Sequence, residues 1–167
     1  MDITSELLET IANALIRKRA TTNRGVLNEA CAYAKPSFFS RGMRIDLNGL
    51  SILFISGTAS IDEHGNGVHI GDLRGKMRRT LKNITGLLAS EDATWHDIVR
   101  TACYLRDIDC DDEAFNEDRT AFFKENGLDP LHVSTGIQAT LCRPELLVEI
   151  EAIAKFYSEK QTTLNRK

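Results

Sequence analysis

The stretch "LLVEIEAIAKF", residues 146–156, alternates apolar and polar side chains along its length. Its small and aliphatic members share one parity: Leu146, Val148, Ile150, Ala152 and Ala154. Because residues two apart lie on the same face of a strand, this pattern predicts a core strand over 146–157. The other parity carries two carboxylates, Glu149 and Glu151, and a thiol and a guanidinium, Cys142 and Arg143, stand just before the strand. This stretch therefore combines a core element with polar chemistry.

The composition is that of a globular domain with a core of its own. The chain has 167 residues, of which 42% are hydrophobic and 27% charged, and its formal net charge is −3. A net negative charge does not favour binding to nucleic acid or to an anionic membrane, which attract basic proteins. No apolar run approaches the roughly 20 residues that a bilayer span needs. We therefore expect no nucleic-acid partner and no membrane partner.

The first 20 residues predict an amphipathic helix appended to the domain. Their apolar positions recur at helical spacing: Ile3, Leu7, Leu8, Ile11 and Leu15. The segment begins with acidic residues, unlike a signal peptide. Four cysteines, at 31, 103, 110 and 142, lack metal-ligand spacing, so we expect reduced thiols, a cytoplasmic location and no metal or other cofactor.

The remaining chain predicts an α+β domain over 21–157, followed by a polar tail over 158–167. Asn48-Gly49 between apolar runs is a strong hairpin signal, and Thr94 and Asp97 have the spacing of a capping box. Strands are predicted over 43–47, 51–56, 98–107, 132–139 and 146–157, and helices over 72–90 and 111–126. Two such helices can cover one face of a mixed sheet. The other face also alternates in apolar residues, which favours a homo-oligomer.

Several segments together resemble the YjgF/Rid family, also called endoribonuclease L-PSP. They are "FISGTASID" (54–62), "GDLRGKMRRTLKNITGLL" (71–88), "DIVRTACYLRDI" (97–108), "FNEDRTAFF" (115–123) and "LLVEIEAIA" (146–154), and the resemblance covers 36–156. It implies an α+β fold like that of the trimeric chorismate mutases. It also implies a homotrimer that binds small-molecule ligands in clefts between subunits.

The resemblance leaves three functions open. Deaminases of enamines and imines in this family carry an arginine shortly after a proline, where this chain has His132 and Val133. Neither side chain replaces a bidentate guanidinium. The segments "KPSFFSRG" (35–42) and "LCRPELLVEIE" (141–151) are similar to the C-terminal half of chorismatases, which are about twice as long. We therefore place first an enzyme acting on an anionic, chorismate-like unsaturated acid, ahead of a deaminase and of a non-catalytic metabolite-binding trimer.

The same resemblances nominate the site residues. Glu149 occupies the glutamate position shared by Rid proteins and chorismatases, and apolar strand neighbours would raise its pKa into the range of a general acid. Arg143 is the first choice to bind a carboxylate of the ligand, and Arg41 is the second. Cys142 is expected in the pocket wall, since no base for a nucleophilic thiol is identifiable.

A short glycine-containing segment completes the predicted site. Ser56, Gly57 and Thr58 close a strand beside Glu149, and their amides and hydroxyls suit an anion. His64 and His69 flank a glycine-rich loop, where histidines are more often solvated than bound to metal. We expect them to be solvated.

Overall fold

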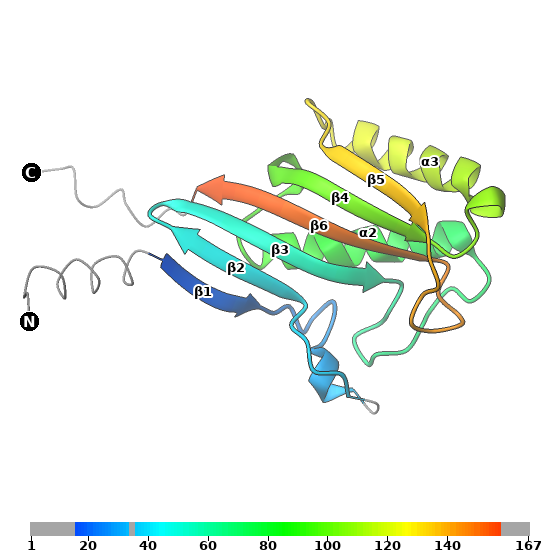
Figure 1. Ribbon diagram of the computed structural model, residues 1–167, viewed down its shortest axis with the longest axis horizontal. Helices are drawn as coiled ribbons and strands as arrows, with labels where there is room; N and C mark the ends of the chain where they lie inside the picture. The colour runs from blue at the N-terminus through cyan, green and yellow to red at the C-terminus, as the bar shows by residue number, and fades with distance from the viewer. Residues whose placement is uncertain (1–15, 34–35, 158–167) are drawn as a thin grey trace, which may run out of the picture.

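The computed structural model describes residues 16–33 and 36–157. Six strands form one sheet in the order β1-β2-β3-β6-β4-β5 (Figure 1). They are β1 Ile16–Thr21, β2 Gly42–Leu47, β3 Leu50–Ala59, β4 Ile98–Leu105, β5 Val133–Gln138 and β6 Val148–Tyr157. Neighbouring strands are antiparallel except β4 and β5, which are parallel. The mixed sheet confirms the predicted α+β fold.

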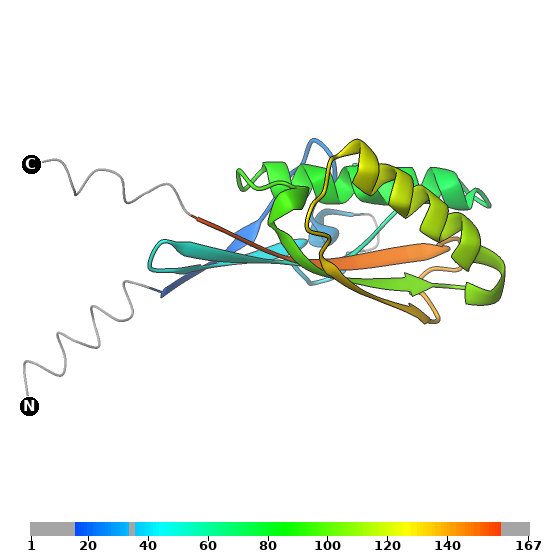
Figure 2. The same ribbon diagram turned by 90° about the horizontal axis from the view of Figure 1, so that it is seen from above.

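Two helices, α2 (Leu73–Ala89) and α3 (Ile108–Glu125), lie on the same face of this sheet (Figure 2). Each begins at an aspartate whose side chain accepts a backbone N–H, at Asp72 from Gly75 and at Asp107 from Cys110. Two short 3-10 turns, η1 (Ala30–Ala32) and η2 (Trp95–Asp97), complete the described elements. The predicted capping box of Thr94 and Asp97 is present. The prediction of two helices on one face is confirmed.

The hairpin between β2 and β3 turns where the sequence predicts it. Asn48 and Gly49 have φ values of 48° and 95°, the left-handed conformation that this residue pair tolerates. The flanking Leu47 and Leu50 face each other across the turn. Local turn chemistry therefore fixes the register of the first half of the sheet.

Strand β1 differs from the sequence prediction of a helix over 1–20. Residues 16–20 belong to this strand, which pairs along its whole length with β2. The segment Ile16–Thr21 has no apolar alternation, so only the neighbouring strand reveals its conformation. Residues 1–15 and the predicted tail 158–167 lie outside the described residues. A smaller difference is that α3 begins at Ile108, because Asp107 caps it, rather than at Asp111.

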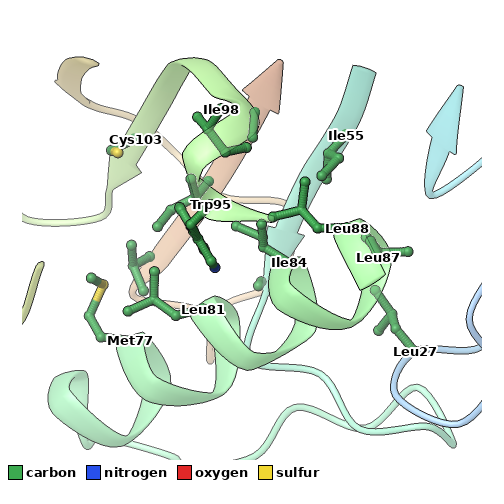
Figure 3. Packing of buried hydrophobic residues seen from close by; sticks show 14 of the residues in the cluster. Leu27, Ile55, Met77, Leu81, Ile84, Leu87, Leu88, Trp95, Ile98 and Cys103 are labelled. Carbon is green, nitrogen blue, oxygen red and sulfur yellow. The ribbon is translucent and has the colours of Figure 1, made fainter. Parts of the chain in front are cut away.

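The hydrophobic core lies between the two helices and the sheet, around Trp95 (Figure 3). The indole ring meets Phe122 of α3 edge-on with 5.0 Å between ring centroids, and its Nε1–H donates to Thr85 Oγ1 at 2.8 Å. Ile84, Leu87 and Leu88 of α2 are fully buried against the same cluster. Because of this packing, alternate residues of the central strands β3, β4 and β6 are buried beneath the helices.

A buried carboxylate joins the first two strands to the end of α2. Glu91 is 3% exposed and accepts from Arg19 of β1 at 2.8 Å, from Thr21 at 2.8 Å and from Arg44 of β2 at 3.0 Å. Arg19 is half-exposed, whereas Arg44 is nearly buried and also pairs with Asp46 at 2.7 Å. A buried charge needs such partners because its desolvation is costly.

The substitution Glu91→Gln should destabilise the protein by about 3 kcal/mol, because it removes the negative charge that pairs with the buried guanidinium of Arg44. Urea unfolding of the full chain measures this loss. Arg19→Gln is the matched control and should cost less than about 1 kcal/mol, as half-exposed ion pairs do. Equal costs for the two variants would contradict a central role for Glu91.

The face of the sheet turned away from the helices is called the open face here. It carries Phe54 of β3, Tyr104 of β4 and Val133 and Ile137 of β5, and Val133 is 68% exposed. None of the helices in the described part of the chain has the length and apolarity to cross a bilayer. The candidate site lies where this face meets the far end of β3.

Candidate active site on the open face of the sheet

Strand β3 bulges at Ser56 and Gly57, beside Glu149 of β6. Ile55 pairs with Ala152 and Thr58 with Ile150, so β3 holds one residue more than β6 in this interval. A Cβ atom built on Gly57 would lie 1.9 Å from Glu149 Oε1 and 2.9 Å from its Cδ. The carboxylate of Glu149 therefore occupies the space that any other residue at position 57 would fill. Bulges of this kind often re-aim a side chain at an active site.

Glu149 is half-buried and poised to exchange a proton. Burial raises the pKa of its carboxyl group, the like charge of Glu151 raises it further, and the Arg41 guanidinium opposes the shift. Within residues 16–33 and 36–157, no hydrogen-bond donor is assigned to this carboxylate. A desolvated carboxyl group without protein partners is free to bind and protonate a ligand.

Tyr104 is a member of the site that the sequence analysis missed. It lies directly across from Glu149 on β4, and its hydroxyl donates to Glu151 Oε2 at 3.1 Å. Burial and this neighbouring carboxylate raise the pKa of the Tyr104 phenol. The signal was in the sequence, since Tyr104 has the opposite parity to the buried Cys103 and Leu105. Glu149, Glu151 and Tyr104 thus form one polar cluster.

Arg41 is joined to the bulge through its backbone. Its carbonyl accepts from Ser56 N at 3.0 Å and from Ser56 Oγ at 3.1 Å, and the side chain is only 5% exposed. The guanidinium carbon stands 5.2 Å from the centre of the Tyr33 ring and 5.0 Å from that of Phe39. The predicted residues Arg41, Ser56 and Gly57 are therefore brought together with Glu149.

The other predicted residues are held differently. Arg143 Nη1 donates to Gly65 O at 2.7 Å, so this arginine fastens the glycine-rich loop, while Cys142 is exposed. Tyr33 links this loop to Arg41, because its ring also covers Gly65, where a Cβ would lie 2.5 Å from ring atoms. Thr58 is fully buried and donates to Ser56 O at 2.9 Å. Thr58 therefore shapes the bulge and does not face a ligand.

Polar side chains of α2 donate hydrogen bonds to backbone carbonyls at the end of β3 and in the glycine-rich loop that follows it. Lys76 is completely buried and donates to Val68 O at 3.0 Å, and burial lowers the pKa of its ammonium group. Asn83 donates to Ala59 O and Ile61 O at 3.0 and 2.9 Å. His64 and His69 are exposed, and the described residues contain no group of three metal-ligating side chains.

A shallow hollow of about 410 Å³ opens on the sheet beside this cluster. Strands β2, β3 and β6 and the segment just before β2 line it with both polar and apolar side chains: Ser40, Met43, Phe54, Ile55, Ser56, Glu151, Ala152 and Ile153. Its size is in the range of small-metabolite sites. It shares Glu151 with the polar cluster and Ser56 with the bulge of β3.

Comparison with known proteins matches the family model described as Endoribonuclease L-PSP over residues 37–156. The chain belongs to the endoribonuclease L-PSP family. The 3-aminoacrylate deaminase RutC of Acinetobacter baylyi is 29% identical over 104 residues, which is 62% of this chain and 79% of that protein. A RutC family protein of Pyrococcus horikoshii is 30% identical over the same shares.

Solved structures of the family share the fold. A Yersinia pestis protein of the Rid family superposes with a TM-score of 0.68 at 26% identity, covering 84% of this chain and all of that one. Escherichia coli TdcF, solved with bound serine, has a TM-score of 0.66 at 20% identity and covers 81% of this chain and 97% of its own. The YjgF/Rid resemblance inferred from the sequence is thus confirmed, and the similarity to chorismatases remains a sequence observation.

The close approach of Gly57 to Glu149 makes a direct prediction. The substitution Gly57→Ala should destabilise the protein by about 1–3 kcal/mol, as overpacking does. In a Glu149→Ala background the same substitution should cost nearly nothing, because the clashing atoms are gone. Gly136→Ala on β5 is the control, since a Cβ there meets nothing within 4 Å. An equal cost of Gly57→Ala in both backgrounds would place the clash elsewhere.

The raised pKa of Glu149 predicts a pH-dependent change in stability. A carboxyl group whose pKa is higher in the folded state favours folding less as the pH rises through that pKa. The isosteric Glu149→Gln should therefore raise the melting temperature at neutral pH by a few degrees, on the order expected for a domain of this size. The difference should shrink as the pH falls and disappear only below about pH 4, under the pKa of the unfolded-state carboxyl group, where both states become protonated. A lower melting temperature for Glu149→Gln at neutral pH would contradict the assignment.

Proposed function

We propose that this protein hydrolyses small anionic enamines or imines, releasing ammonia and a 2-oxo acid. The observation that carries the proposal is the carboxyl group of Glu149, which is half-buried against Gly57, has a raised pKa and accepts no hydrogen bond from residues 16–33 and 36–157. The similarity to a 3-aminoacrylate deaminase supports the reaction class. Glu151, Tyr104 and Ser56 supply the polar surroundings of the reacting group.

The chemistry needs one group that both accepts and donates a proton. In the proposed reaction, water attacks the imine carbon while the carboxylate of Glu149 accepts a proton from it. Glu149 passes that proton to the imine nitrogen, which gives a neutral carbinolamine. The carboxylate then accepts the carbinolamine hydroxyl proton and passes it to the same nitrogen, so that the C–N bond breaks, ammonia leaves and the carbonyl forms. A carboxyl group with a pKa moved towards neutrality is suited to both steps. The balance is imine plus water giving a 2-oxo acid plus ammonia, with no further cofactor.

The open face suggests how the site is enclosed. Phe54 lines the hollow, and Val133 and Ile137 leave further apolar surface on β5 of the same face. We propose that further copies of this chain cover this face in a homotrimer and close the ligand cleft, in the cytoplasm. Arg143 and Cys142, on the loop before β6, are proposed to line the rim of that cleft.

A chorismate-like substrate and a purely metabolite-binding role remain alternatives from the sequence. The structure and the relatives add no support specific to either. Both are separated from deamination by the same assay, because chorismate cleavage yields pyruvate without ammonia and a binding protein yields neither.

The decisive experiment supplies purified full-length protein with 2-aminoacrylate generated in situ and follows ammonia release above the spontaneous rate. Wild-type protein should accelerate release, and Glu149→Gln should lower the rate by about 100-fold or more, as loss of a general acid–base does. Glu113→Gln, on the exposed side of α3, is the matched control and should leave the rate unchanged.

A folded wild-type protein that fails to accelerate ammonia release would contradict the proposal. Pyruvate release from chorismate that disappears in Glu149→Gln would replace it with the chorismatase-like reaction. Ammonia release that persists undiminished in Glu149→Gln would move the catalytic group elsewhere.

A further inference from the structure

Where the family resemblance implies a substrate-binding arginine, this chain has Val133 and His132. Neither can serve as a guanidinium, and His132 lies in an aromatic cluster. Its ring packs against Phe123 with 4.9 Å between ring centroids and lies beside Trp95 at 6.3 Å, and the surrounding burial lowers the pKa of its imidazole. A neutral ring in an aromatic cluster cannot replace a bidentate guanidinium. The proposed substrate therefore needs another cationic partner.

Arg41 has the properties of such a partner. Arg41 is only 5% exposed, and its guanidinium lies close to the rings of Tyr33 and Phe39. Its Nε donates to Asn28 O at 3.2 Å. In the described part of the chain, no acceptor is assigned to its two terminal nitrogens. Neither terminal nitrogen is among the fully buried polar atoms that lack a partner, so both reach the surface of the site and this planar pair of donors is available to a ligand.

The location of Arg41 fits the reacting group. Its carbonyl binds both the amide and the hydroxyl of Ser56, the residue before Gly57, and Gly57 in turn lies against the carboxylate of Glu149. The guanidinium also exerts an electrostatic effect on Glu149. The cation and the acid–base group are thus attached to the same bulge.

We propose that Arg41 binds the carboxylate of the substrate and so determines that the site accepts small 2-imino and 2-oxo acids. This inference rests on the proposed function for the identity of the acid. The stacked rings hold the guanidinium plane, which leaves its two terminal nitrogens to pair with the two carboxylate oxygens. A ligand in which a neutral amide replaces the carboxylate cannot form this charged pair with the guanidinium.

Pyruvate, the stable product expected from 2-aminoacrylate, is a probe that needs no turnover. Isothermal titration of the full-length protein should show saturable binding of pyruvate and none of pyruvamide. Arg41→Met keeps the length of the side chain against both rings and should weaken pyruvate binding at least about 10-fold. The pyruvate affinity of Arg41→Lys should lie between those of the wild type and Arg41→Met, because lysine keeps the positive charge but lacks the planar pair of donors.

Two controls separate binding from folding and from catalysis. Arg78→Gln, an exposed arginine of α2, should bind pyruvate like the wild type, and Glu149→Gln should retain binding while losing turnover. A ¹H–¹⁵N spectrum checks that each variant is folded. If Arg41→Met proves unfolded, Arg41→Lys and Phe39→Leu, which removes one of the stacking rings, give the test.

Undiminished pyruvate affinity in folded Arg41 variants would overturn the inference, as would wild-type protein that shows no saturable binding. Loss of binding in Arg143→Gln alone would assign the carboxylate to Arg143 instead. Failure of the proposed function has a different signature, because pyruvate would still bind through Arg41 while ammonia release stayed at the spontaneous rate.

Discussion

The close contact between Gly57 and the carboxylate of Glu149 is the constraint around which the site is organised. Strand β3 gains one residue against β6 at this point, and the missing side chain of Gly57 leaves room for the carboxylate. The carboxyl group is thereby partly shielded from water next to a second carboxylate, Glu151. Those two circumstances both raise the pKa of Glu149, and they require no metal or cofactor. The bulge of β3 therefore places Glu149 where its pKa is raised, which suits the carboxyl group to acid–base catalysis.

The remainder of the fold holds that contact in place. Trp95 and α2 hold one face of the sheet, and Lys76 and Asn83 bind the carbonyl groups of the loop that follows the bulge. On the other side Tyr33 covers Gly65 and stacks on Arg41, which binds Ser56 through its carbonyl. A buried lysine and a buried arginine are costly to desolvate. Their presence at the loop after β3 and at the bulge itself argues for a positioned site rather than for stability alone.

Local signals made most of the fold predictable. Asn48-Gly49, the capping box of Thr94 and Asp97, and the alternation around Val148 act over a few residues, and the structure confirms each. Strand β1 was mispredicted because its conformation depends on β2 and on Glu91, 72 residues away from Arg19. Within the site, sequence and family resemblance singled out Glu149, Gly57 and Arg41. They missed Tyr104, whose parity in the strand placed it on the face of Glu149 but whose register with Glu149 only the strand pairing sets. They also missed Tyr33, which reaches the site only through the loop at Gly65.

The central claim concerns the protonation of a single carboxyl group, and it can be measured directly. A ¹³C NMR titration of the side-chain carboxyl of Glu149, assigned by comparison with Glu149→Gln, gives its pKa in the intact protein. The account predicts a midpoint clearly above the value of about 4.3 found for glutamate in model peptides, and a lower midpoint when Glu151 is changed to glutamine. A midpoint at or below the model value would show that Glu149 is an ordinary solvated carboxylate and would contradict the assignment of the site.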